Sequence, residues 1–186
     1  MKINIKNMVC DRCISAVNTL FVELKIPVSN LELGEIETVN LLSQAELKIL
    51  NEHLKKQGFE ILENAVKTQT EHIKKIIILK IADLDIDEDF TLSKFISAHF
   101  AKDYSLLSKT FSTHENVTLE QYFILQKIEK AKELLLYNEF TLTEISQKLG
   151  YKSVQYLSAQ FKNCTGFNPT SFKKLKSKNR IALDQV

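Results

Sequence analysis

The chain has 186 residues, and its 25 lysines and arginines nearly balance 23 aspartates and glutamates, so the formal net charge is only +2. Hydrophobic residues make up 44% of the chain, whereas glycine and proline number only 4 and 2. This composition favours a compact, helix-rich protein and excludes a disordered one. The longest apolar run, residues 76–79, is far too short to span a bilayer, and the N-terminus lacks a signal-type segment. We therefore expect a cytoplasmic protein with no membrane partner.

The two ends of the chain differ in charge. Residues 1–70 hold 8 basic and 9 acidic side chains, whereas residues 141–186 hold 8 basic and 2 acidic ones. The basic residues are closely spaced near the C-terminus, at Lys173, Lys174, Lys176, Lys178 and Arg180. A local excess of this kind attracts phosphate backbones, although a solvated tail would have the same composition.

Up to about Val66, the hydrophobic pattern alternates between the period of strands and that of helices. The expected elements are a strand at 3–5, a helix at 14–24, a hairpin turning at Gly34 within 31–39, a helix from Ser43 to Gly58 and a strand at 59–62. This βαββαβ order predicts a ferredoxin-like layer of helices on an antiparallel sheet.

After Val66 the strand pattern disappears, and we expect only helices. They are predicted at 70–84, 92–100, 104–114, 119–137, 142–149 and 153–164, with an acidic loop at 83–89 and a capping box at 141–144. We place the domain boundary in residues 64–72. The prediction is an α+β chain, in which a ferredoxin-like module of residues 1–66 precedes an all-α domain of residues 67–186.

Residues 150–169 carry the signals of a short helix held between two turns. Ser153 is a suitable N-cap, and Gly166 suits the position just after the helix. Leu157 and Phe161 lie four residues apart on one helical face, so the polar residues between them project from the other face. A short helix with an apolar back and a polar front suits the major groove of DNA.

Two candidate helix-turn-helix units occur in tandem, and we call the second helix of each unit its reader helix. The first unit pairs 92–100 with 104–114, and the second pairs 142–149 with 153–164. Both reader helices contain Leu-Ser-x-x-Phe, beginning at Leu107 and at Leu157. The 19-residue helix between the units is about 28 Å long. Because successive major-groove faces lie about 34 Å apart, such a rod presents both readers to one side of a duplex.

Residues 121–135, 142–151 and 150–172 together resemble the AraC/XylS family of bacterial transcription regulators, and the resemblance covers roughly residues 70–176. It implies a domain that binds double-stranded DNA through two readers and recruits or positions RNA polymerase. By position, the family's base-reading residues fall on Ser105, Ser108 and Lys109 in the first reader and on Gln155, Tyr156 and Ala159 in the second, with Ser158 and Lys162 as phosphate contacts. Two positions depart from the family's usual turn glycines, at Ala101 and at Asn116.

Cys10 and Cys13 form a CxxC motif between the first strand and the first helix. With this element order, residues 1–64 resemble a heavy-metal-associated domain of the copper-chaperone type, which implies that the two cysteines bind Cu(I) or another thiophilic metal. The chemistry agrees, because a helix N-terminus stabilises thiolate and two soft thiolates suit Cu(I). A closed zinc site needs four ligands, and no second ligand pair has a useful spacing. Redox sensing and a purely docking or dimerising module remain alternatives.

The sequence contains no catalytic constellation and no phosphate-binding glycine loop, so we do not expect an enzyme. We predict a sequence-specific DNA-binding transcription regulator in which metal at Cys10 and Cys13 changes homodimerisation or reader orientation, and so DNA affinity. A competing class is a metal-trafficking chaperone or docking adaptor whose helical half does not bind DNA. A third is a constitutive regulator whose N-terminal module only contacts proteins.

Overall fold

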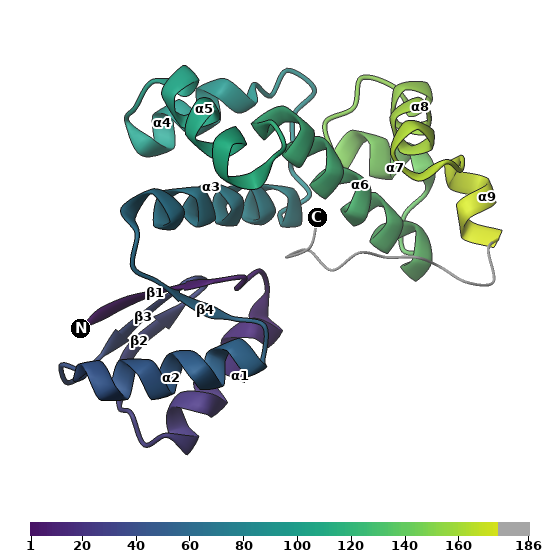
Figure 1. The fold of residues 1–186 in the computed structure, drawn as a ribbon. Helices are drawn as coiled ribbons and strands as arrows, with labels where there is room; N and C mark the ends of the chain where they lie inside the picture. The colour runs from purple at the N-terminus through teal and green to yellow at the C-terminus, as the bar shows by residue number, and fades with distance from the viewer. Residues whose placement is uncertain (175–186) are drawn as a thin grey trace. The chain divides into compact units, whose positions relative to one another are not determined.

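The computed structural model of the protein describes residues 1–174 (Figure 1). The chain divides into two compact units, Met1–Ile76 and Ile77–Val186, and the division falls within helix α3 (Ala65–Ala82). The boundary predicted between residues 66 and 67 falls in the first turn of the same helix. Three of the predicted basic residues, Lys176, Lys178 and Arg180, lie outside the described residues.

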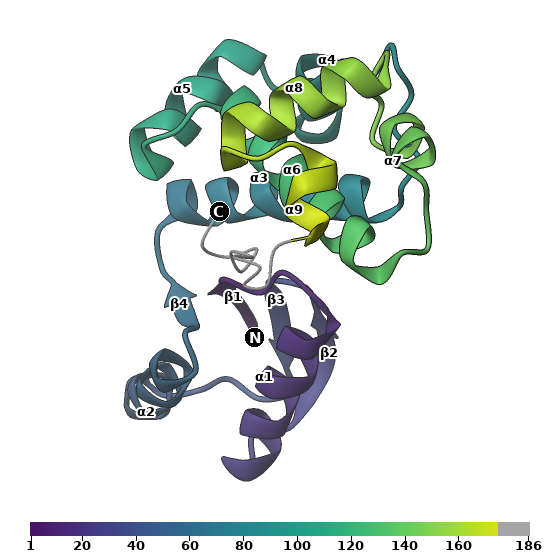
Figure 2. The same ribbon diagram turned by 90° about the vertical axis from the view of Figure 1, so that its right-hand side faces the viewer.

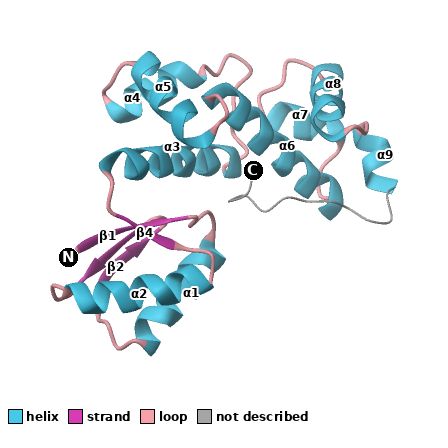
Figure 3. Ribbon diagram, viewed as in Figure 1, coloured by secondary structure: helices cyan, strands magenta, loops and turns pink. Residues whose placement is uncertain are grey.

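The N-terminal unit is a small antiparallel sheet with helices. Its strands are β1 (Lys2–Lys6), β2 (Val28–Glu32), β3 (Glu35–Thr38) and β4 (Glu60–Leu62), and its helices are α1 (Asp11–Glu23), α2 (Gln44–Lys56) and the start of α3. The strand order is β2-β3-β1-β4, and each neighbouring pair is antiparallel. Figure 3 shows α1 and α2 together on one side of this sheet.

The core of this unit lies between the sheet and these two helices. Ile5 and Ile36 alternate with more exposed residues along their strands and are at most 1% exposed, as are Phe21 of α1 and Leu50 of α2. The helix predicted from Ser43 is confirmed, because the Ser43 hydroxyl accepts a hydrogen bond from the Glu46 N–H and the Glu46 carboxylate accepts one from the Ser43 N–H. This reciprocal pairing satisfies two backbone donors that the helix itself leaves free.

The C-terminal unit is all helical among the described residues. It contains the end of α3 followed by α4 (Leu92–Phe100), α5 (Tyr104–Glu115), α6 (Leu119–Tyr137), α7 (Leu142–Lys148), α8 (Val154–Thr165) and α9 (Pro169–Lys174). Helix α6 contacts α5, α7, α8 and α9, so it forms the centre of the unit (Figure 2). The predicted capping box at 141–144 is confirmed at the start of α7. Within residues 1–174, no helix is both long and apolar enough to cross a membrane.

One sequence prediction needs correction, and another is incomplete. The segment expected to link the domains is helical, since α3 begins at Ala65 rather than near Thr70. The Asn64 side chain accepts a hydrogen bond from the Val66 N–H over 2.8 Å and so caps the start of the helix. The apolar pattern begins only near Thr70, so it did not indicate this earlier start. The acidic stretch 83–89 is a loop, as expected, but Ile86 within it is only 3% exposed and bridges to Leu149.

Candidate nucleic-acid interface

The first reader helix, α5, is fixed at its start and along its back. The Asp103 carboxylate caps it by accepting hydrogen bonds from the Ser105 and Leu106 N–H groups, at 2.8 and 3.3 Å. Leu107 and Phe111 are 0% exposed, as the Leu-Ser-x-x-Phe spacing predicts. Because the buried face is filled, the remaining side chains of α5 are presented outward.

The second reader helix, α8, is built on the same plan. The Ser153 hydroxyl accepts a hydrogen bond from the Tyr156 N–H over 3.1 Å, which confirms the predicted N-cap. Leu157 and Phe161 are 0% exposed, and the Phe161 ring meets that of Phe172 edge-on at 5.4 Å between centroids. The two reader helices therefore bury matching leucine and phenylalanine side chains.

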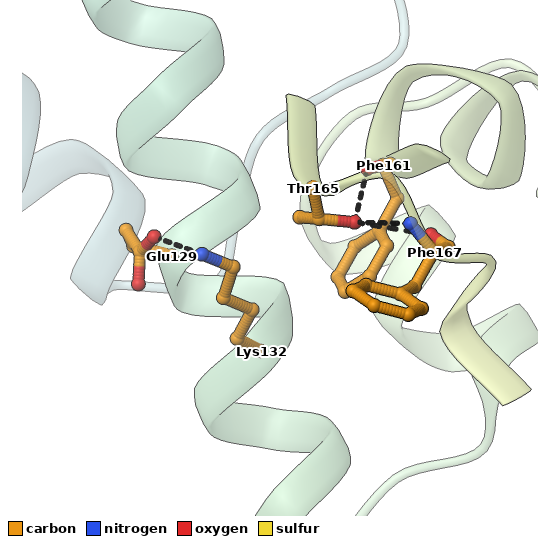
Figure 4. Close-up of polar contacts among 5 residues, drawn as sticks. All are labelled: Glu129, Lys132, Phe161, Thr165 and Phe167. Atoms are coloured by element: carbon orange, nitrogen blue, oxygen red, sulfur yellow. Dashed lines mark hydrogen bonds and ion pairs between the residues drawn. The ribbon is translucent and has the colours of Figure 1, made fainter. Parts of the chain in front are cut away.

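The end of α8 is closed by a left-handed residue and a threonine. Gly166 has φ 80°, as expected of the residue after a helix, and its N–H donates to the Lys162 carbonyl. The Thr165 hydroxyl donates to the Phe161 carbonyl over 2.7 Å and accepts from the Phe167 N–H over 3.2 Å (Figure 4). These contacts end α8 sharply and set the path of the chain into α9.

The predicted DNA-contacting residues fall on the outer faces of α5 and α8. Exposed are Ser105, Lys109, Gln155, Tyr156, Ala159 and Lys162, while Ser108 and Ser158 are half-buried. In both views α5 and α8 lie on the same side of α6 (Figures 1 and 2). The two reader helices thus lie on one side of the unit, and the individual roles of their residues are predictions.

A comparison of the two reader helices identifies residues that the sequence analysis missed. The repeat has an offset of 50 positions, because Leu107 and Leu157 are equivalent. Lys102 and Lys152 then occupy equivalent positions directly before the N-caps, and both are exposed. A lysine beside a helix N-terminus is well placed for a phosphate contact. The matching spacing in the sequence was the signal that could have found this pair.

The turn between α7 and α8, in the second helix-turn-helix unit, requires glycine at position 150. Gly150 has φ 65°, and a Cβ there would lie 2.5 Å from the Ile86 side chain and 2.7 Å from the Asp87 carbonyl oxygen. The Ile86 N–H donates to the Lys148 carbonyl over 3.2 Å. The loop before α4 therefore packs tightly against the turn that leads into the second reader.

A buried lysine holds this same turn to α6. Lys127 is 7% exposed, its Nζ donates to the Leu149 carbonyl over 2.9 Å, and it lies 3.7 Å from the centroid of the Tyr151 ring. Burial lowers the pKa of Lys127 to about 8. The Tyr151 hydroxyl in turn donates to Gln160 Oε1 on α8 over 2.6 Å. These contacts form a continuous path from α6 through the turn to the second reader.

The first reader is also tied to α6 by a polar contact. The Tyr104 hydroxyl donates to Glu120 Oε1 over 2.5 Å. Burial, followed by the Glu120 hydrogen bond, raises the pKa of the Tyr104 hydroxyl well above its usual value. The same hydrogen bond lowers the pKa of Glu120. Each reader is therefore anchored to α6 by polar side chains as well as by its apolar face.

Helix α6 contains a buried ion pair between Glu129 and Lys132, whose side chains are 5% and 8% exposed (Figure 4). Removal of one partner would leave the other charged group buried, which is costly. Charged residues at these positions are expected to be exposed from sequence alone. Their burial shows that α6 is covered on several sides.

The CxxC motif lies at the start of α1, where Cys10 is the N-cap residue. The two sulfur atoms are 3.6 Å apart, and the Cys13 thiol also approaches the Asn7 carbonyl at 3.8 Å. Since metal–thiolate bonds are about 2.3 Å long, both sulfurs are within reach of one ion, and the pair fits a thiophilic metal. Within residues 1–174, no group of three or more potential ligands gathers around a common point.

The environment of Cys13 differs from the sequence-based expectation. The N-terminus of a helix was expected to favour thiolate, but partial burial raises the pKa of Cys13 above its usual value. Desolvation outweighs the backbone hydrogen bonds that favour the charged form. Metal binding at this cysteine would therefore have to displace a proton that burial favours.

Comparison with known proteins gives a match for the C-terminal unit. Residues 96–175 match the family model described as a helix-turn-helix domain. The C-terminal domain of the two-component response regulator yesN from Fusobacterium nucleatum is 28% identical, with coverage of 55% of this chain and 99% of that chain and a TM-score of 0.48.

Two curated bacterial regulators also resemble this chain. The xylose operon regulatory protein of Escherichia coli K12 is 33% identical over 73 residues, which are 39% of this chain and 19% of that protein. The arabinose operon regulatory protein of the same strain is 24% identical over 140 residues, or 75% of this chain and 44% of that protein. The chain thus spans less than half the length of either relative. The chain is therefore similar to bacterial operon regulatory proteins, and its residues 96–175 match a helix-turn-helix domain.

Proposed function

We propose that this chain is a sequence-specific DNA-binding transcription regulator. The observation that carries the proposal is the pair of exposed reader helices, α5 and α8, each capped, each buried along a Leu-x-x-x-Phe face and both anchored to α6. The similarity to two operon regulatory proteins supports it. RNA polymerase is proposed as a protein partner on the resemblance alone. A second copy of the chain is proposed as the partner whose association metal at Cys10 and Cys13 would change.

The reader side chains suit the functional groups of the major groove. An amide such as that of Gln155 can pair with both N6 and N7 of adenine, and an amine such as that of Lys109 can donate to guanine O6 and N7. Lys162 at the far end of α8 would contact a phosphate instead. Base readout and backbone attachment are therefore assigned to different side chains.

Alanine variants at Gln155 and Lys162 test this assignment by fluorescence anisotropy on duplexes enriched from a randomised pool. We expect Gln155→Ala to weaken binding by about 1–3 kcal/mol and to relax the choice at one base pair. Lys162→Ala should weaken binding to every duplex by the same factor. It should also reduce the slope of log affinity against log salt concentration by about one. Lys94→Ala, which removes an exposed lysine from α4, is the matched control. Equal losses on every duplex for both variants would contradict the assignment.

We further propose that the N-terminal unit is a ferredoxin-like module of the heavy-metal-associated type. The βαββαβ element order, the strand order β2-β3-β1-β4 and the position of the CxxC motif at the start of α1 support this assignment. Cys10 and Cys13 would hold a thiophilic ion such as Cu(I), which would supply a soft Lewis acid bound by their thiolates. Metal binding at this pair would alter homodimerisation or the orientation of the readers.

The double variant Cys10→Ser with Cys13→Ser tests the metal proposal. We expect loss of bound Cu(I) under reducing conditions and loss of any copper effect on DNA affinity. Unchanged metal stoichiometry together with unchanged DNA binding would contradict it. Transfer of copper to a partner protein, in a chain that binds no DNA, would instead favour a metal-trafficking chaperone.

A further inference from the structure

The exposed face of α5 carries one large apolar side chain, and it lies where the helix begins. Leu106 is 59% exposed, although its neighbour Leu107 is 0% exposed. Ser105 and Lys109, on the same face of the helix, are polar. Leu106 is the third residue of α5, and its N–H is held by the Asp103 carboxylate. Its position relative to the rest of the reader is therefore fixed by the cap.

The repeat assigns Leu106 a counterpart in the second reader. With Leu107 equivalent to Leu157, position 106 corresponds to Tyr156. Tyr156 is 57% exposed, so both readers keep a large side chain outside the core at the same place. Tyr156 is already among the expected base-contacting residues, whereas Leu106 is not. Two equivalent helices with the same exposed position point to a shared use of that position.

The major groove offers a leucine one kind of apolar partner. Among the base edges there, only thymine presents a methyl group, and the other groups are hydrogen-bond donors and acceptors. The N-terminal residues of a recognition helix are those that reach the base edges. A leucine in the first turn of such a helix therefore favours binding when it covers a methyl group. It disfavours binding when it covers a polar base edge and leaves that edge without a hydrogen-bond partner.

We propose that Leu106 is a specificity-determining residue that packs on the 5-methyl group of a thymine in the major groove. This inference rests on the proposed function, because it requires α5 to lie in that groove. It assigns to the first reader a preference for thymine at one position, which the serine and lysine residues of α5 do not supply.

The test replaces single thymines by deoxyuridine, which removes the methyl group and leaves the hydrogen-bonding edge unchanged. The probe is the duplex most enriched by the wild-type protein from a randomised pool. Each thymine of that duplex is replaced in turn, and affinities are measured for the wild type, for Leu106→Ala and for Leu79→Ala. Leu79 is an exposed leucine of α3, at 44%, outside both readers, and is the matched control.

At one thymine we expect wild-type affinity to fall about fourfold on replacement, the factor for one buried carbon at about 0.8 kcal/mol. Leu106→Ala should bind the original duplex more weakly and should be indifferent to that replacement. Leu79→Ala should behave as the wild type does. If each replacement has the same effect on the wild type and on Leu106→Ala, the assignment of Leu106 is wrong while the proposed function stands. Failure to enrich any duplex would overturn the proposed function and this inference with it.

Discussion

Burial of Lys127 has a consequence for stability that depends on pH. In the folded chain the pKa of Lys127 is about 8, against 10.5 for an exposed lysine. Between these values the unfolded chain holds a proton that the folded chain has lost, so stability rises as pH rises. Below about pH 8 the cost of burying the charge is present in full, and above about pH 10.5 it is absent.

The magnitude follows from the gap between the two pKa values. At about 1.4 kcal/mol for each tenfold change in proton affinity, the full gap corresponds to about 3 kcal/mol. Of this total, about 2 kcal/mol should be gained in the free energy of unfolding between about pH 7 and about pH 9.5. The Tyr151 ring and the Leu149 carbonyl favour the charged form, so these figures are upper limits.

The assay compares urea unfolding of the wild type and of Lys127→Met across this pH range by circular dichroism. The variant removes the titrating amine, and all other groups titrate in both proteins. We expect the wild type to gain up to about 2 kcal/mol relative to Lys127→Met by about pH 9.5. Lys94→Met, from an exposed position on α4, should show no such gain. A constant difference between the wild type and Lys127→Met at every pH would refute the argument.

Three further predictions concern the turns and the cysteine pair. Gly150→Ala should destabilise the chain by about 2 kcal/mol or more, because its Cβ would meet Ile86 at 2.5 Å at a left-handed φ; an unchanged urea midpoint would contradict this. Ala101 has φ 49°, so Ala101→Gly should raise the melting temperature slightly, since relief of about 1 kcal/mol of strain exceeds the entropic cost of glycine. Because burial raises the pKa of Cys13, Cu(I) affinity measured against a competing chelator should increase with pH across the neutral range, and a pH-independent affinity would count against thiolate ligation.

The local signals in the sequence predict most of the helices well. The helix start predicted at Ser43 and the capping box predicted at Thr141 are both confirmed, because each depends on side chains within one turn. The buried Leu157 and Phe161 follow from helical spacing. Such features depend only on residues a few positions apart, which a single sequence contains.

The contacts that position the second reader depend on distant residues and were not predicted. Lysine is among the residues least expected in a core, so nothing in α6 indicates that Lys127 is buried beneath Tyr151. Residues 83–89 were predicted only as an acidic loop, yet Ile86 among them pairs with Leu149. Both contacts join residues more than twenty positions apart. Such contacts form only when the turn before α8 is folded, so a pattern within one helix does not predict them.

The most direct test of the account is a salt-dependent anisotropy titration of the whole protein with two duplexes of equal length. One duplex is enriched from a randomised pool, and the other has the same bases in scrambled order. We expect the enriched duplex to bind on the order of a thousandfold more tightly, with both affinities falling as salt increases. Equal affinity for the two duplexes at every salt concentration would contradict the claim that α5 and α8 read DNA sequence.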